Sequence, residues 1–250
     1  MKNPSLWLLA AVVAVPMAAA AEGSVVGEFD AYTLALSWEP TFCEGKPAAP
    51  ECASQSSNRF DASNLALHGL WPDRDGNASH VYGYCGADAA EQALDRPATW
   101  CRLPEPTLSA ETRGALAAAM PGAASCLDRH EWVRHGSCSG LTADAFFSYT
   151  AELVRRVAAT SFGRYLTAHA GKTVDANEVV AAFEADFGEG GGRKLVLNCT
   201  KVRGADALLE AHLRLPKDLG PASELTSMAG ETDERGNCPA SFLLDPIPTR

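Results

Sequence analysis

The stretch Leu65-Ala66-Leu67-His68-Gly69-Leu70-Trp71-Pro72 begins with the alternation that is typical of a β-strand. Leu65 and Leu67 fall on one face of this strand, and His68 falls on the other. We expect Gly69 to let the backbone turn closely and Pro72 to stop the strand. The pattern therefore places His68 on the face opposite the leucines. An isolated histidine there would more often make only a local hydrogen bond.

A second stretch, His130-Glu131-Trp132-Val133-Arg134-His135-Gly136-Ser137-Cys138, is better explained as a helix. At about 100° per residue, His130, Glu131, Arg134 and His135 share one face, while the two apolar side chains between them point to the core. We expect Gly136 to end this helix. His130 and His135 are five residues apart, so we expect them not to share one zinc ion as the histidines of a His-Glu-x-x-His motif do.

Other segments carry clear start and stop signals. Ser109 and Thr142 are predicted N-caps, Asp175 precedes a third helix, and Gly188 follows it. Helices interrupt strands without regular alternation, which favours an α+β domain with a central, mainly antiparallel sheet packed with helices. The predicted helices are 109–120, 143–160 and 176–187, and the predicted strands are 29–38, 65–68, 194–202, 208–215 and 241–244.

The first 21 of the 250 residues have the form of a secretory signal peptide, with Lys2, an apolar run and an alanine-rich end. The apolar run is shorter than the roughly 20 residues of a membrane span. We therefore expect an exported, periplasmic or secreted chain in which residues 22–250 form a single domain. Loss of Lys2 would change the net charge from −10 to −11, which disfavours tight, non-specific binding of a polyanion but allows a local cationic cleft.

The histidines, the carboxylate and the guanidinium of the two stretches fit acid–base chemistry at a phosphate. Two imidazoles that titrate near neutrality can remove and return protons. Arg134 can grip non-bridging phosphate oxygens as a fork and cannot lose its charge. Glu131 is expected to hold Arg134 and to favour the charged form of nearby imidazoles, although the pair could also be an ordinary surface ion pair. None of this requires a metal or cofactor.

These residues resemble a known family. The run from His68 to Pro72 resembles the first signature of the ribonuclease T2 family, and the run from His130 to Cys138 resembles the second, usually written His-Glu-Trp-x-Lys-His-Gly-Thr-Cys. Arg134 and Ser137 depart from that pattern. The Leu34-Ala35-Leu36-Ser37-Trp38 strand, the eight cysteines and the signal segment are similar to the bacterial periplasmic ribonuclease I branch, so the resemblance covers nearly the whole mature chain.

The resemblance implies a metal-independent endoribonuclease that cuts single-stranded RNA with low base specificity. Cleavage would pass through 2′,3′-cyclic phosphates to 3′-phosphate ends. We expect His135 to act as base and His68 as acid, although these two roles could be exchanged, with His130, Glu131 and Arg134 stabilising the pentacoordinate phosphate. We expect a monomer that needs no protein partner. An inactive binding module with the same fold and a metal-dependent nuclease are the alternatives.

Trp71 and Asp73 are candidates for contact with a base, by stacking and by hydrogen bonding. A core role for Trp71 and a turn role for Asp73 are the structural alternatives; Tyr82 and Tyr84 are further candidates. Eight cysteines in an exported chain suggest four disulfides, and spacing alone leaves the pairing open. The family pattern implies the pairs Cys43 with Cys52, Cys85 with Cys138, Cys199 with Cys238 and, by what remains, Cys101 with Cys126.

Overall fold

The computed structural model describes residues 24–74, 82–218, 230–232 and 234–247. The predicted signal segment, residues 1–21, lies outside the described residues. Within the described part of the chain, no helix is long and apolar enough to cross a membrane.

A six-stranded sheet forms the centre of the fold. Its order is β2-β1-β5-β6-β3, and β4 also pairs with β5. The pairs are antiparallel except for a single parallel contact between β5 and β6. This confirms the predicted α+β class with a mainly antiparallel sheet. The strands are β1 (Ala31–Ser37), β2 (Ala66–Asp73), β3 (Thr173–Asp175), β4 (Leu195–Val202), β5 (Ala205–Pro216) and β6 (Ser241–Leu243).

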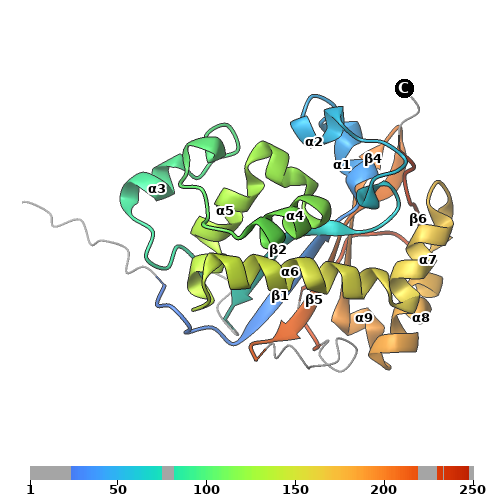
Figure 1. Cartoon of the computed structure of the whole chain (residues 1–250). Coiled ribbons are helices and arrows are strands. Elements are labelled where there is room, and N and C mark those ends of the chain that lie inside the picture. The colour runs from blue at the N-terminus through green and yellow to red at the C-terminus, as the bar shows by residue number, and fades with distance from the viewer. Residues whose placement is uncertain (1–23, 75–81, 219–229, 233, 248–250) are drawn as a thin grey trace, which may run out of the picture.

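Helices cover the sheet, and Figure 1 shows the long helix α6 running across it, with α4 and α5 beside α6 and with α7 and α8 at one end. The core lies between these helices and the sheet, where Leu34, Leu36, Phe146 and Phe147 are fully buried. The α-helices are α1 (Glu39–Gly45), α2 (Pro50–Ala53), α3 (Ala89–Leu94), α4 (Ala110–Ala119), α5 (Leu127–Arg134), α6 (Ala143–Ala158), α7 (Ser161–His169), α8 (Ala176–Phe187) and α9 (Gly191–Lys194).

The three helices predicted from their end signals are confirmed. The side chains of Ser109, Thr142 and Asp175 accept backbone N–H bonds at the starts of α4, α6 and α8. Gly188 follows the last residue of α8, as expected. Six elements, which are mostly short, were not predicted from the sequence: α1, α2, α3, α7, α9 and β3.

Two predicted ends were wrong. Pro72 does not stop β2, because the strand continues to Asp73 and Pro72 pairs with Tyr32. A proline is tolerated there because β2 is at the edge of the sheet, where one row of backbone groups has no strand partner. Gly69 makes no turn and lies within the strand, opposite Ala35. The second error concerns α5, which ends at Arg134, so that His135 stands at the C-cap.

Four disulfides tie the described residues together, and no described cysteine is free. The pairs are the same as those implied by the family pattern. Cys85–Cys138 joins the segment that follows α5 to the chain that precedes α3, across 53 residues. The others are Cys43–Cys52, Cys101–Cys126 and Cys199–Cys238.

Candidate active site

A β-bulge presents His68. Along β2, Gly69 pairs with Ala35 and Leu67 pairs with Leu36, so His68 is an extra residue without a partner in the register. Bulges commonly re-aim a side chain beside a functional site. The His68 ring reaches across β1 to Glu210 on β5, and Nδ1 lies 2.6 Å from Oε1 of that carboxylate.

The centre of the site is the Glu131 carboxylate, which is fully buried. Its Oε2 accepts a hydrogen bond of 2.9 Å from Nε1 of Trp71. Its Oε1 lies 3.9 Å from Nε2 of His68 and 3.7 Å from Nε2 of His130, and has no hydrogen-bond partner among the described residues. Glu131 therefore gathers residues from β2 and α5 around one point.

His130 is held by Asp95 and Trp100, which were not predicted from the sequence as site residues. Its Nδ1 lies 2.5 Å from Oδ1 of Asp95, and its ring stacks on Trp100 with 4.7 Å between centroids. The hydroxyl of Tyr84 donates to the other oxygen of Asp95 at 2.7 Å. Nη1 of Arg134 donates to the same hydroxyl at 3.3 Å. Asp95 thus fixes His130 and, through Tyr84, also locates Arg134.

The structure corrects the expected pairing of Glu131 with Arg134. Among the described residues, Arg134 forms no ion pair with a carboxylate within 4.0 Å, and its guanidinium instead lies over the Tyr84 ring, 5.4 Å from the centroid. An arginine that is not neutralised by a direct carboxylate partner keeps its charge available for a phosphate.

His135 is placed differently from the other two histidines. Its ring lies 5.5 Å from the Trp71 ring and 5.8 Å from the His130 ring, measured between centroids. The residue is only 8% exposed, and Nδ1 is buried without a hydrogen-bond partner among the described residues. In the part of the chain that the structure describes, no carboxylate therefore orients this ring through Nδ1.

The expectation that helical spacing keeps His130 and His135 too far apart for one metal ion is wrong. Because His135 has left the helix, ligand atoms of His130, Glu131 and His135 lie within 4.8 Å of one another. Helical spacing therefore does not keep the two histidines apart, and independence of a metal remains a prediction for a chelation experiment.

Burial and charge push the pKa values of the three histidines in different directions. Burial opposes the charge on His68, but the hydrogen bond to Glu210 and the charges of Glu131 and Glu210 outweigh it and raise the pKa of His68. Burial lowers the pKa of His130, despite Asp95. Burial, together with the charges of His130, Arg134 and His68, lowers the pKa of His135 well below its usual value. At pH 6.5, the usual pKa of a histidine, these surroundings favour the charged form of His68 and the neutral form of His135.

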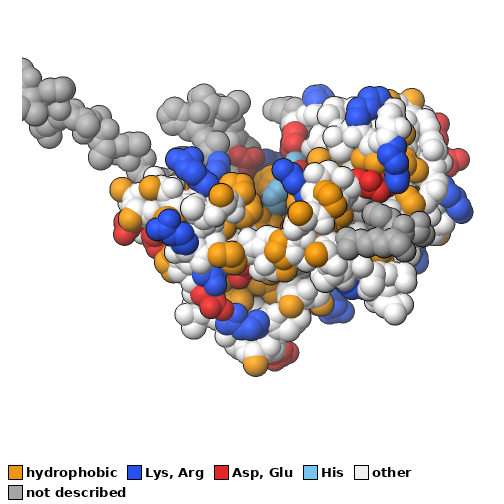
Figure 2. Space-filling view, turned by 90° about the horizontal axis from the view of Figure 1, so that it is seen from above, with side chains coloured by type: hydrophobic (Ala, Val, Ile, Leu, Met, Phe, Trp, Pro, Cys, Tyr) orange, Lys and Arg blue, Asp and Glu red, His pale blue; other side chains and the backbone are white. Residues whose placement is uncertain are grey.

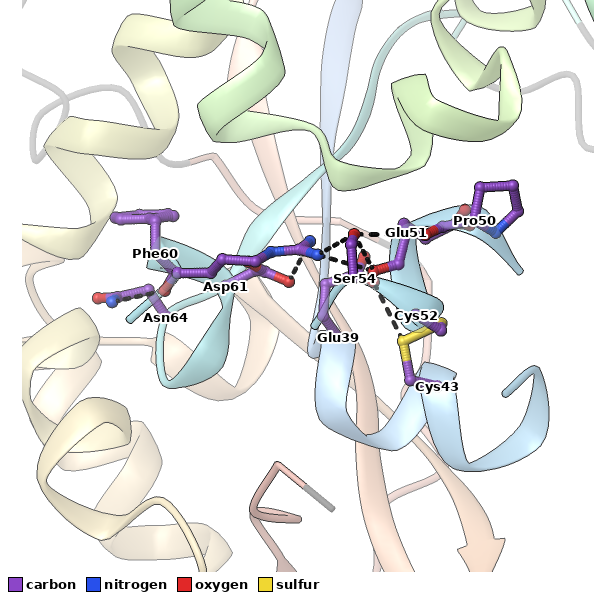
Figure 3. Close-up of polar contacts among 10 residues, drawn as sticks. Glu39, Cys43, Pro50, Glu51, Cys52, Ser54, Phe60, Asp61 and Asn64 are labelled. Atoms are coloured by element: carbon purple, nitrogen blue, oxygen red, sulfur yellow. Dashed lines mark hydrogen bonds and ion pairs between the residues drawn. A yellow bond between two sulfur atoms is a disulfide. The ribbon is translucent and has the colours of Figure 1, made fainter. Parts of the chain in front are cut away.

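The carboxyls near His68 are themselves shifted. Burial raises the pKa of Glu131 to about 7. Glu39 of α1 is buried close to Asp61 and Glu51, and burial together with these two charges raises its pKa to about 8. Figure 3 shows Glu39, Glu51 and Asp61 close together. Arg59 donates to both oxygens of Asp61 at 2.9 and 2.8 Å. Glu39 is thus largely neutral at pH 7 and adds little negative charge beside His68.

The two predicted base contacts differ in position. The Trp71 ring is half-buried and lies among His68, His135 and His212. Asp73 is at the exposed end of β2, where its carboxylate lies 3.6 Å from Nη1 of Arg214. Figure 2 shows histidine side chains reaching the surface near the middle of one face, with lysine or arginine side chains to either side.

Comparison with known proteins identifies the family. The model of the ribonuclease T2 family matches residues 29–221. The chain belongs to the ribonuclease T2 family. Ribonuclease I of Escherichia coli K12 is 30% identical over 265 residues, which are 96% of this chain and 98% of that protein. A ribonuclease of Aeromonas hydrophila is 32% identical over 128 residues, which are 51% of this chain and 46% of that protein.

Solved T2 ribonucleases share the fold. Ribonuclease MC1 from bitter gourd seeds superposes with a TM-score of 0.53 and 17% identity, over 86% of this chain and 100% of that one. The SF11 self-incompatibility ribonuclease of Nicotiana alata gives 0.58 and 14%, over 87% and 100%. Membership of the T2 family makes this protein an endoribonuclease.

Glu210 and His212 were also not predicted from the sequence as site residues. His212 lies between Glu210, 3.0 Å from its Nε2, and Glu234, 2.9 Å from its Nδ1. The only sequence signal was that both residues fall on one face of a predicted strand. That face could be linked to the site only if the strand was known to lie beside β1.

Proposed function

We propose that this T2 ribonuclease is exported and cuts single-stranded RNA by transphosphorylation, without a metal and with low base specificity. The supporting observation is the contrast between His68 and His135. Both rings lie beside Trp71, yet the surroundings favour the charged form of one and the neutral form of the other. An acid and a base are thereby available at the same pH.

In the first step, His135 accepts the proton of the 2′-hydroxyl, and the 2′-oxygen forms a bond to the adjacent phosphorus. The bond from phosphorus to the 5′-oxygen breaks, and this oxygen takes a proton from Nε2 of His68. The products are a 2′,3′-cyclic phosphate and a free 5′-hydroxyl. In the slower second step, His68 takes a proton from water and the water oxygen bonds to phosphorus. The bond from phosphorus to the 2′-oxygen breaks, this oxygen takes a proton from His135, and a 3′-phosphate is formed.

Arg134 and His130 stabilise the negative charge of the pentacoordinate phosphate. Arg134 supplies a permanent cation, and preorganised charge of this kind is commonly worth about 10²- to 10³-fold in rate. Glu131 keeps the Nε2 atoms of His68 and His130 directed to one point, since its Oε1 lies within 4 Å of both. Trp71 positions the substrate by stacking, and Asp73 is proposed to contact a base.

Charge and export fit the same proposal. The net charge of −10 opposes lasting attachment to RNA, so attraction is confined to the cations of the site. Four disulfides suit an oxidising compartment. Residues 1–21 would serve as the signal peptide, and residues 22–250 would act as a single-domain monomer without an obligate partner.

A digest of matched RNA and DNA oligonucleotides in EDTA, with analysis of the product ends, tests the proposal. We expect cyclic-phosphate and then 3′-phosphate ends from RNA, and intact DNA, because DNA lacks the internal nucleophile. His68→Ala and His135→Ala should each abolish cleavage. Activity that EDTA removes, or RNA products that end in 3′-hydroxyls, would refute the mechanism.

The pH profile provides a second test. The rate should rise with pH as His135 loses its proton, below the usual histidine pKa of 6.5, and should fall as His68 loses its proton, above 6.5. The result is a bell-shaped profile with its maximum at mildly acidic pH. A rate that keeps increasing to pH 9 would contradict the assignment of His68 as the acid.

A further inference from the structure

Behind His68 lies a chain of charged side chains that the reaction itself does not use. Glu210 contacts His68 through Oε1 at 2.6 Å and His212 through Oε2 at 3.0 Å. His212 in turn contacts Glu234 through Nδ1 at 2.9 Å. Both oxygens of Glu210 and both nitrogens of His212 are therefore engaged.

The sheet holds this chain in place. Glu210 pairs with Ser37 and His212 pairs with Ala35 on the central strand β1. These small side chains leave room above β1, so that the ring of His68 on β2 meets side chains of β5. The side chains of His68, Glu210 and His212 are 29%, 21% and 9% exposed. Such partly buried pairs hold a fixed geometry better than fully exposed ones.

We propose that Glu210 is a positioning residue for His68, and that the cationic His212, held between Glu210 and Glu234, weakens the electrostatic effect of Glu210 on the His68 ring. The inference rests on the proposed role of His68 as proton donor. A carboxylate at Nδ1 fixes the proton on that nitrogen and directs Nε2 at the departing oxygen. Nδ1 of His135, which has no hydrogen-bond partner among the residues that the structure describes, shows the contrasting arrangement in the same site.

The groups that face His68 make opposite contributions to its charge. Glu210 and Glu131 favour the protonated ring, whereas the cationic His212 disfavours it. The two neighbouring carboxylates raise the pKa of His212 to about 9, so this ring is charged throughout the working range. Among the described residues, Glu39 of α1 and the histidines His130 and His135 also interact with the charge of His68.

Two substitutions should therefore move the titration of His68 in opposite directions. Glu210→Gln removes the stabilising anion and should lower the pKa of His68. His212→Gln removes the nearby cation and should raise it. If these residues only stabilised the fold, the two substitutions would not shift the pKa of His68 in opposite directions.

The experiment follows the imidazole resonances of the whole protein by NMR between pH 4 and 10, with His68 assigned through His68→Ala. Asp206→Asn is the matched control. Asp206 is on the same strand as Glu210 and pairs with Lys201 at 2.8 Å, and its substitution changes the net charge by the same amount as Glu210→Gln. It should leave the titration unchanged. Glu210→Asp, which keeps the charge, should lower the His68 midpoint less than Glu210→Gln does.

Kinetics give the second measurement. In Glu210→Gln the alkaline limb of the pH–rate profile should move to lower pH, with roughly tenfold loss of kcat at pH 8. In His212→Gln the limb should move to higher pH. Any pattern other than opposite displacements of the His68 midpoint overturns the inference. Because NMR needs no turnover, a protein with these shifts but without cyclic-phosphate products would refute the proposed function and leave the inference standing.

Discussion

Gly69 is the position where one methyl group should do most damage. A Cβ atom built there would lie 2.0 Å from Oε2 of Glu131 and 2.4 Å from Nε1 of Trp71. These two atoms form the hydrogen bond that orients the central carboxylate. Gly69→Ala therefore drives a methyl group between the β2 backbone and Glu131.

The magnitude follows from these distances. Ordinary contacts of a Cβ begin at 3.4 Å, so the buried carboxylate must retreat by about 1 Å or more. Overpacking of this kind costs about 1–3 kcal/mol, and leaving the Trp71 N–H and the Glu131 carboxyl without their hydrogen bond costs about 1–3 kcal/mol. A displacement of about 1 Å in a catalytic constellation lowers the rate by roughly 10²-fold.

The assay combines kcat/KM for a dinucleotide substrate with a thermal melt. We expect activity to fall by about 10²-fold and Tm to fall by roughly 5 to 15 °C. Gly114→Ala is the control, because a Cβ at Gly114 in α4 meets nothing within 4 Å. It should keep full activity and gain up to about 1 kcal/mol of stability. If Gly69→Ala retained activity within twofold of wild type, Glu131 would not need its observed position.

Three further predictions concern other parts of the molecule. Replacing Cys85 and Cys138 by alanine releases the segment after α5, and calorimetry should show a loss of about 3–4 kcal/mol together with loss of activity. Arg134→Lys keeps the charge but not the fork, so steady-state kinetics should show a loss within about tenfold, against about 10²- to 10³-fold for Arg134→Ala. The contacts of His212 raise its pKa from 6.5 to about 9, and those of Glu210 lower its pKa from 4.5 to about 2. The contribution of the ionised His212 and Glu210 side chains to the free energy of unfolding is therefore complete between pH 4.5 and 6.5, and it is lost as pH rises through 9 or falls through 2. In urea unfolding, the stability of His212→Gln should differ most from that of wild type near pH 6 and little at pH 10.

Local chemistry explains which elements could be predicted from the sequence. The helix α8 has Asp175 at its start and Gly188 after its end, so both boundaries were evident. Pro72 misled because its cost depends on whether a neighbouring strand needs its missing N–H, and only the topology reveals that β2 is an edge. The C-terminal end of α5 was misjudged by one residue, and this was enough to change the direction of His135.

The site was predictable only where its residues are close in sequence. His130, Glu131, Arg134 and His135 were grouped by helical spacing, and His68 by its place on a strand. The groups that hold the histidines come from far away: Asp95 is 35 residues from His130, and Glu210 is 142 residues from His68. No local pattern links residues at such separations, because strand order and loop packing bring them together.

The difference between the proposed acid and base has its origin in the sheet. The bulge turns His68 toward β5, where Glu210 lies on the far side of the small residues of β1. The Glu210 carboxylate favours the charged form of the His68 ring. His135 stands at a helix end among other positive groups and is buried, with no carboxylate at Nδ1 in the described part of the chain, which favours the neutral ring. The two imidazole side chains are chemically the same, and only their surroundings differ. In the proposed mechanism, exchange of the two surroundings would exchange the favoured protonation states, so the element that carries each ring would determine the direction of proton transfer.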